Sequence, residues 1–314
     1  MRAGVVVPVG PSPVELVRLE DVLASVRAHV PDLEVLVLLD DSDEPRDLEA
    51  LLQGDGPNLV VLRPPPLARP VHRDDRMSAG ALTFLRWLAD HDRADYLVQL
   101  DTDALVIGDF RPSLEAAIER RPDVAVWGAH RVNVEGGEQR DFSMFALPLL
   151  QAQAPLRMRF GGSGLPRRPA VQQAILGPAA RGRRYARALV RAARSNGYET
   201  GEHCLGGAYG ITTAAARRMR EQGWLDDPLA TRHTHLPDDV LVGLLARAAG
   251  LGLGSLVAPG EAFALKFQGL LAGPEELIAR GHAVVHSVKG HEGCTEADLR
   301  SRFRRARSAV PAGV

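Results

Sequence analysis

Short apolar runs alternate with longer helical patterns through the first third of the chain, and few folds accommodate this alternation. The apolar runs are residues 4–9, 34–39, 58–62 and 96–100. Residues 14–29 and 77–91 repeat apolar side chains at helical spacing between these runs, and residues 46–53 have the pattern of a shorter helix. Buried strands joined by helices are typical of a parallel sheet covered on both faces. We therefore predict an α/β fold with a mixed, mostly parallel, Rossmann-like sheet flanked by helices.

The size and composition of the chain suit a globular protein with a large core. Its 314 residues suffice for about two domains or one large sheet domain. Hydrophobic residues make up 45% of them, which excludes disorder, collagen-like repeats and a disulfide scaffold. The two cysteines, Cys204 and Cys294, suit a reducing compartment. Strand-like residues begin at Gly4, which leaves no room for a secretory signal, and no apolar stretch reaches about 18 residues, so we expect a cytoplasmic protein.

The second half of the chain is less regular. Its expected helices are residues 179–195, 213–222, 238–249, 274–280 and, as a basic surface helix, 295–307. Its expected strands are residues 124–127, 206–212, 253–257 and 283–286, with mixed strand character over 131–147. The helix over 238–249 has the clearest ends, because two acidic residues lie in its first turn and Gly250 follows its last residue.

Two acidic clusters directly follow apolar strands in the first third of the chain. Asp40-Asp41-Ser42-Asp43 follows the second strand, and Asp101-Thr102-Asp103 follows the fourth. Ligands of open α/β sheets bind beyond the carboxyl ends of the strands. Two carboxylates at positions i and i+2 can both reach one hard cation, which prefers oxygen ligands and can neutralise a departing diphosphate. A polar turn explains either cluster equally well, and the first cluster could instead contact a nucleotide base or ribose.

Further along the chain, four side chains have ligand or catalytic chemistry. His286 ends a short apolar strand and is either a satisfied structural histidine or a nitrogen ligand for an ion such as Mn²⁺. Lys289, three residues later, could bind phosphate as a point charge. Asp238 and Asp239 begin a helix, where acidic residues favour helix stability, but a carboxylate there could also act as a general base.

Taken in order, these motifs resemble those of the GT-A-fold glycosyltransferases. The resemblance spans residues 4–290 and rests on Val5-Val6-Val7-Pro8, Leu39-Asp40-Asp41-Ser42-Asp43, Leu100-Asp101-Thr102-Asp103, Gly206-Gly207-Ala208-Tyr209, Pro237-Asp238-Asp239-Val240-Leu241-Val242-Gly243 and His286. Residues 203–209 and 238–243 are similar to the fringe-like β-1,3-glycosyltransferases. The turn at residues 40–43 is closer to the bacterial polysaccharide-type inverting transferases. The resemblance implies a GT-A-type sheet.

The resemblance also implies a role for each matching residue. Asp103 and His286 would bind Mn²⁺ or Mg²⁺ directly, and Asp101 would contact the ribose or a metal-bound water. Asp239 matches the second acid of the family's Glu-Asp pair, which is the general base of inverting members. The other matches are Pro8, Asp40, Asp41 and Lys289 on the donor side, with Asp41 near the nucleobase, and Gly206, Gly207 and Asp238 beside the donor sugar and acceptor. Asp238 departs from the family, which usually has Glu there.

The implied function is that of an inverting, divalent-metal-dependent glycosyltransferase. Such an enzyme moves a sugar from a nucleoside-diphosphate sugar, most commonly a UDP-sugar in this family, to an acceptor hydroxyl. One alternative is a nucleotide-sugar or glycan-binding module without catalysis. Another is a sugar nucleotidyltransferase, which needs a glycine- and arginine-rich loop after its first strand, where this chain has Gly10-Pro11-Ser12-Pro13.

The chain is expected to form one continuous domain with two functional halves. Residues 1–130 would bind the nucleotide sugar, and residues 131–290 would bind the acceptor and carry out catalysis. An arginine-rich insert, residues 151–200, interrupts the second half. Residues 291–314 would form a basic C-terminal helix and tail.

The arginine-rich insert has the most unusual charge distribution in the chain. Residues 157–194 contain ten arginines and no acidic residue, whereas the whole chain has a net charge of −1. Such a block indicates an anionic partner for this segment. It could be a solvated basic helix, a site for an anionic or lipid-linked acceptor, or a peripheral contact with the acidic inner face of a membrane. Nucleic acid is not expected, because only Phe160 and Tyr185 interleave with the arginines.

Overall fold

The computed structural model describes residues 1–42, 44–49, 58–67, 72–132, 141–153 and 169–309. A seven-stranded sheet in the order β3-β2-β1-β4-β7-β6-β8 runs through it. Its strands are β1 (Ala3–Val9), β2 (Val35–Asp40), β3 (Asn58–Leu62), β4 (Tyr96–Leu100), β6 (Val124–Gly128), β7 (Ala208–Thr212) and β8 (Gly252–Ser255). Neighbouring strands pair in parallel except β7, which is antiparallel to both β4 and β6. The predicted mixed, mostly parallel sheet is therefore confirmed.

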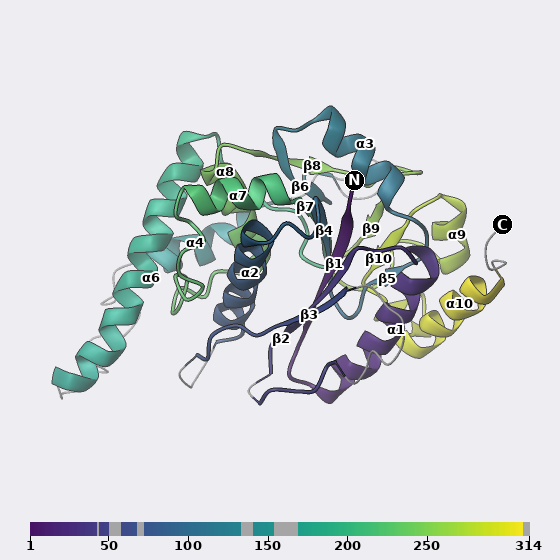
Figure 1. Cartoon of the computed structure of the whole chain (residues 1–314), viewed down its shortest axis with the longest axis horizontal. Coiled ribbons are helices and arrows are strands. Elements are labelled where there is room, and N and C mark those ends of the chain that lie inside the picture. The colour runs from purple at the N-terminus through teal and green to yellow at the C-terminus, as the bar shows by residue number, and fades with distance from the viewer. Residues whose placement is uncertain (43, 50–57, 68–71, 133–140, 154–168, 310–314) are drawn as a thin grey trace.

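Helices cover both faces of this sheet (Figure 1). One face packs against α2 (Arg73–Asp90), α6 (Pro169–Ser195), α7 (Thr213–Glu221) and α8 (Asp238–Ala248). The core on the other face includes residues of α1 (Pro13–His29), α3 (Arg111–Arg120), α9 (Pro274–Ala279) and α10 (Glu296–Ala309), and α10 packs against α1 and α9. The strands supply both cores because successive side chains point to opposite faces: Val5 and Val7 lie in the core under α1, and Val6 lies in the core under α2.

A smaller sheet brings the C-terminal third of the chain beside the turn that follows β4. It has the order β5-β10-β9, with β5 (Leu105–Val106), β9 (Phe263–Leu265) and β10 (Val284–His286). β10 pairs antiparallel with β5 and parallel with β9. A hairpin of β11 (Gly290–His291) and β12 (Cys294–Thr295) follows. The sequence predicted β10, but β5, β9, β11 and β12 are too short to carry a recognisable pattern.

Two of the predicted elements are wrong in their described parts. Residues 46–49 do not form a helix, and Arg46 instead forms an ion pair with Asp40 at 2.8 Å. Residues 50–53 lie outside the described residues. The strand character predicted over 131–147 is replaced near its end by a single 3₁₀ turn, η3 (Ser143–Phe145), and by the start of α4 (Ala146–Gln153); residues 133–140 lie outside the described residues.

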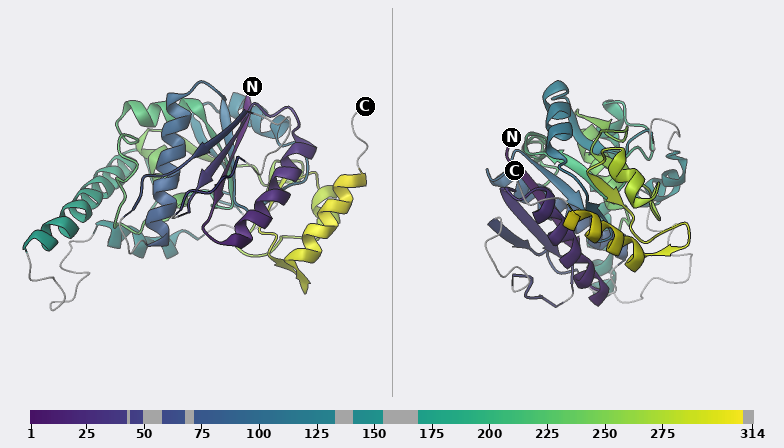
Figure 2. Two further views of the ribbon diagram at one scale, coloured as in Figure 1. Left: turned by 60° about the horizontal axis from the view of Figure 1, so that its bottom comes forward. Right: turned by 90° about the vertical axis from the view of Figure 1, so that its right-hand side faces the viewer.

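The helices α6 and α10 lie at opposite ends of the molecule (Figures 1 and 2). α6 begins earlier than predicted, packs against α4 and α8, and projects beyond the sheet. α10 was expected on the surface, but its inner side is part of the core, with Leu299, Arg300 and Phe303 buried. Within the described residues, the helices lack the combination of length and apolar character that crossing a bilayer requires.

Candidate active site

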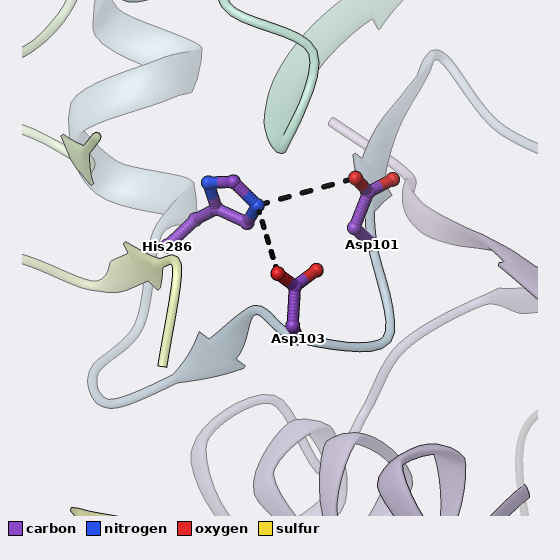
Figure 3. A group of neighbouring side chains, drawn as sticks. All are labelled: Asp101, Asp103 and His286. Atoms are coloured by element: carbon purple, nitrogen blue, oxygen red, sulfur yellow. Dashed lines mark ion pairs between the residues drawn. The ribbon is translucent and has the colours of Figure 1, made fainter. Parts of the chain in front are cut away.

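Asp101, Asp103 and His286 lie together where the two sheets meet (Figure 3). Both aspartates lie in the turn after β4, and His286 is the last residue of β10. The Nε2 atom of His286 is 3.4 Å from Oδ2 of Asp103 and 4.0 Å from Oδ2 of Asp101. One potential ligand atom from each residue lies within 4.8 Å of the other two, so all three can reach the same ion. The structure thus brings together three residues that the sequence analysis selected from distant segments.

Hydrogen bonds fix the two aspartates relative to the neighbouring segments. The backbone N–H of Asp101 donates to the carbonyl of Gly207 at 3.0 Å, and that of Val288 donates to the carbonyl of Asp103 at 2.9 Å. The hydroxyl of Ser287 donates to Oδ2 of Asp103 at 2.8 Å. The turn after β4 is therefore tied both to the start of β7 and to the segment after β10.

The ring of His286 is oriented so that one nitrogen faces the aspartates. Its Nδ1 lies 2.9 Å from the carbonyl oxygen of Lys266, and because a carbonyl can only accept, Nδ1 carries the proton. The lone pair of the neutral ring is then on Nε2, the arrangement that a hydrogen-bonded metal ligand adopts. Gly207 packs against the ring so closely that any Cβ there would overlap Nδ1. This glycine, predicted near the donor sugar, also makes room for His286.

The charged groups of this cluster shift one another's pKa values. Burial alone would lower the pKa of His286, but its hydrogen bond to Asp103 and the charge of that carboxylate raise it. Burial alone would raise the pKa of Asp103, but His286 and Lys289, whose Nζ is 2.8 Å from Oδ2, hold it well below its usual range. Burial and the carboxylates of Asp103 and Asp238 raise the pKa of Asp101. Two carboxylates and one imidazole with this excess of negative charge fit Mn²⁺ or Mg²⁺.

Two pockets continue from this cluster toward the strand ends of β1 and β2. The lining of the first includes Pro8, Asp41, Arg76, Asp101 and Asp238. The second shares Asp41 and Arg76 with the first and has a volume of about 370 Å³. Asp101 therefore lies beside the pocket that also contains Pro8 and Asp41, two residues predicted on the donor side.

Asp40 lines the second pocket, but its carboxylate is already engaged by protein groups. It is 2% exposed and accepts hydrogen bonds from Ser42 and Arg46. Burial alone would raise its pKa, but these hydrogen bonds lower it. Arg63 and Arg76 also line this pocket. The sequence analysis missed both, because no local signal distinguishes them from the chain's many other arginines.

Asp238 and Asp239, the first two residues of α8, have different surroundings. Asp238 lines the pocket beside Asp101, and burial together with the charge of Asp239 raises its pKa. The side chain of Asp239 is 16% exposed, and its Oδ2 is 3.4 Å from Nε2 of the buried His203. The sequence analysis assigned no role to His203, because a single histidine in no metal-binding pattern carries little signal.

Gly206 and Gly207 lie between Asp239 and the candidate metal-binding cluster. A Cβ at Gly206 would be 3.3 Å from Oδ2 of Asp239, while Gly207 contacts His286. Two consecutive residues therefore separate the candidate base from the candidate metal ligands.

No family model and no curated protein matches this chain. Among solved structures, the galactosyltransferase LgtC, in complex with donor and acceptor sugar analogues, is 14% identical over 99% of this chain and 97% of its own, with a TM-score of 0.48. An active-site mutant of LgtC is 14% identical over the same shares, with a TM-score of 0.47. Core-mannan synthase A of Aspergillus fumigatus, in its Mn/GDP form, is 10% identical over 81% of this chain and 72% of its own, with a TM-score of 0.40.

Proposed function

We propose that this protein is a divalent-metal-dependent glycosyltransferase that moves a sugar from a nucleoside-diphosphate sugar to an acceptor hydroxyl. The observation that carries the proposal is the cluster of Asp101, Asp103 and His286 beside a pocket at the carboxyl ends of parallel strands. Such strand ends are the usual ligand-binding edge of an open α/β sheet. Oxygen and nitrogen ligands at this edge suit an ion that binds a diphosphate.

The donor diphosphate would lie against the cluster, with its nucleoside toward the two pockets. Asp101, Asp103 and His286 would hold Mn²⁺ or Mg²⁺, which neutralises charge on the departing diphosphate. Lys289 lies close enough to Asp103 to interact with the same phosphates. Arg63 and Arg76 add positive charge to the pocket lining, and Asp41, which lines the same pocket, would contact the base or ribose. UDP is the proposed nucleotide, following the resemblance in the sequence.

Asp239 is the proposed general base. An acceptor hydroxyl is a weak nucleophile at neutral pH, so a carboxylate must remove its proton as the oxygen attacks the anomeric carbon. Asp239 lies beyond Gly206 and Gly207 from the metal-binding residues, so base and leaving group can act on opposite sides of the sugar. Attack from that side displaces the diphosphate with inversion. Asp238, in the pocket with Asp101, would contact the donor sugar or acceptor instead.

Donor turnover tests this proposal. The protein would be incubated with Mn²⁺ and a panel of UDP- and GDP-sugars, and release of nucleoside diphosphate would be measured with water or added sugars as acceptor. We expect turnover with at least one donor and a product of inverted anomeric configuration. Asp239→Asn should lower the rate about 10²–10⁴-fold without changing donor affinity, because only proton removal is lost.

Other outcomes of this experiment identify the alternatives. Donor binding without turnover in the wild-type protein would indicate a binding module. Asp239→Asn would then have no effect on a reaction rate. Formation of a nucleotide sugar from a sugar 1-phosphate and a nucleoside triphosphate would indicate a nucleotidyltransferase. A product with retained configuration would exclude Asp239 as the base of an inverting displacement.

The acceptor is proposed to be anionic or lipid-linked because of the charge on α6. Five arginines of this helix are exposed, namely Arg181, Arg184, Arg187, Arg191 and Arg194. The opposite side of the helix packs into the core through Leu189 and Ala193. A basic face of this kind attracts anionic groups, whether on the acceptor or on the surface of a membrane that carries it.

A further inference from the structure

One face of α8 contacts the segment of residues 201–203 along two of its turns. Asp239, Gly243 and Arg247 follow one another at intervals of four residues, so they lie on the same side of the helix. Each of the three meets part of residues 201–203. This segment therefore runs along the helix with a fixed position relative to Asp239.

Two contacts hold the segment in place. Glu202 is fully buried and accepts hydrogen bonds from the Arg247 guanidinium at 2.6 and 3.0 Å. A Cβ at Gly243 would be 2.5 Å from the carbonyl oxygen of Glu202, so only glycine lets the segment come this close to the helix. These contacts position the next residue, His203, beside Asp239.

The ring of His203 is completely enclosed. Its exposed fraction is 0%, and Phe142 and Phe145 pack against it with ring centroids 5.5 and 4.4 Å away. Nδ1 lies 2.6 Å from the carbonyl oxygen of Gly201, and Nε2 lies 3.4 Å from Oδ2 of Asp239. Each ring nitrogen thus faces an oxygen atom.

The chemistry of these two oxygens determines where protons can lie. The carbonyl of Gly201 can only accept, so Nδ1 must carry a proton. In a neutral ring Nε2 then has a lone pair, which would face the ionised carboxylate of Asp239. Two acceptors facing each other in a buried site are unfavourable, and one proton between them relieves the conflict. The geometry of the pair therefore favours one proton held between Nε2 and Oδ2.

We propose that His203 is a positioning residue that works with Asp239 as a proton-accepting pair. This inference rests on the proposed function, because it assigns the destination of the proton that Asp239 removes. In the reactive form Asp239 is ionised and Nε2 of His203 carries no proton. The acceptor oxygen bonds to the anomeric carbon as the bond from that carbon to the diphosphate breaks. The hydroxyl proton moves to Asp239 and is shared with Nε2 of His203.

The other titratable groups near the ring do not compete for this proton. Glu202 is bound by Arg247 and by Nε2 of His130 at 2.8 Å. The hydroxyl oxygen of Tyr198 accepts a hydrogen bond from the N–H of Gly201. Asp238, on the adjacent helical position, lines the pocket beside Asp101. Asp239 is thus the carboxylate that the Nε2 atom faces.

Nuclear magnetic resonance of ¹⁵N-labelled histidine rings tests the shared proton without any substrate. The signal of His203 is identified by its loss in His203→Asn. We expect a proton on Nδ1 at high pH, and we expect the ring to gain its second proton at a higher pH in the wild-type protein than in Asp239→Asn. The carboxylate favours the charged ring, so removing it must lower the pH of this step. Equal titration in both proteins, or a neutral ring protonated on Nε2, would overturn the proposal.

The pH dependence of donor turnover supplies a second test. His203→Asn keeps a side-chain N–H that can donate to Gly201 but removes Nε2. We expect turnover to fall about 10-fold or more, with unchanged donor KM, and the acidic limb of the kcat profile to move to lower pH, since an isolated carboxylate binds its proton less tightly. His130→Gln replaces another buried histidine, whose Nε2 contacts Glu202, and is the matched control that should keep the wild-type pH profile.

The outcomes separate this inference from the proposed function. If His203→Asn lowers the rate but leaves the pH profile unchanged, His203 has only a structural role and the inference is wrong. The same holds if His203→Asn and wild type are indistinguishable. If the ring titrates as expected but the wild-type protein turns over no donor, the shared proton stands and the proposed transferase activity fails.

Discussion

At the scale of single residues, Gly206 and Gly207 each make room for one of the proposed functional side chains. Gly207 gives space to the ring of His286, and Gly206 gives space to the carboxylate of Asp239. Neither position has the left-handed backbone that favours glycine, so the missing side chain matters here through space alone. Substitution at either position therefore tests one function at a time.

Gly207→Ala should weaken metal binding more than Gly206→Ala. The new Cβ at position 207 would overlap the His286 ring and displace Nε2 from the aspartates, whereas at position 206 it would only touch Asp239. Losing the orientation of one ligand typically costs about 10- to 100-fold in metal affinity. Titration of Mn²⁺ by calorimetry measures the difference, and equal affinity in the two variants would contradict this role of Gly207.

The residues of the candidate site differ in how well the sequence predicts them. Asp101 and Asp103 follow a strand and share a motif, so a local pattern selects them, and the resemblance adds His286. His203 and Arg76 were missed because their importance arises only from neighbours that folding brings near. No spacing rule links His203 to Asp239, since their contact depends on how residues 201–203 pack along α8.

At the scale of elements, α10 contacts the turn that carries the two aspartates of the candidate metal site. Its Arg300 is 5% exposed and donates to the carbonyl of Thr102 at 2.9 Å and to Oδ2 of Asp21 at 3.0 Å. Thr102 lies between the two aspartates of the cluster. The helix expected as a basic surface element therefore contacts the site directly through Arg300. The sequence did not indicate this contact, because Arg300 is one of several arginines in the basic tail.

Arg300→Met should destabilise the protein and weaken its Mn²⁺ affinity. Removing one partner of a buried ion pair typically costs about 3–5 kcal/mol when the other charge is left unpaired. Arg300→Met should cost less than this, because Asp21 keeps its contacts with Arg304 and Arg307. Arg304 also contacts Asp21 but has a side chain that is 52% exposed, so Arg304→Met should cost less than about 1 kcal/mol. Urea unfolding and Mn²⁺ titration of both variants make the comparison. Equal effects of the two substitutions would show that α10 does not act through Arg300.

The contact between α8 and residues 201–203 should make stability depend on pH through Glu202. Burial alone would raise the pKa of Glu202, but hydrogen bonds from His130 and Arg247 lower it from 4.5 to about 2. Because the folded-state pKa is lower than the unfolded one, this contribution is complete above about pH 4.5 and disappears as the pH falls toward 2.

Glu202→Gln tests this dependence. At pH 7 it should cost about 3 kcal/mol of unfolding free energy, the value of a shift of this size. The difference from the wild-type protein should shrink as the pH is lowered from 4.5, which urea unfolding at several pH values would measure. A difference that is constant with pH would mean that Glu202 contributes through packing rather than through its charge.

At the scale of the whole molecule, the sequence predicted the type of sheet better than the order of its strands. The strands β1 to β4 and the helices α1 and α2 follow a regular alternation, and their predicted positions agree with the structure within a few residues, whereas the helix predicted over 46–53 is absent from residues 46–49. The antiparallel insertion of β7 between β4 and β6 was not predicted, because strand order depends on contacts between distant segments. The division into functional halves, the roles of the site residues and the partner of the exposed arginines on α6 remain predictions.

The charge distribution of the molecule is also only partly predictable from the sequence. The arginines on the outer face of α6 are visible in the sequence as a block. The carboxylates around the candidate metal site are only partly visible as a block, because Asp101 and Asp103 follow β4 whereas Asp238 begins α8. Only the folded chain collects them around one position, and a cation there would compensate their charge.

The most direct test of the central claim is thermal unfolding with nucleoside diphosphates in the presence and absence of Mn²⁺. The claim is that Asp101, Asp103 and His286 hold one divalent ion against a diphosphate. UDP or GDP at about 100 times its dissociation constant should add roughly 2.7 kcal/mol of stability when Mn²⁺ is present. The stabilisation should disappear with a chelator and in Asp103→Asn. Stabilisation that needs no metal or persists in Asp103→Asn, or none by either nucleotide with Mn²⁺, would contradict the claim.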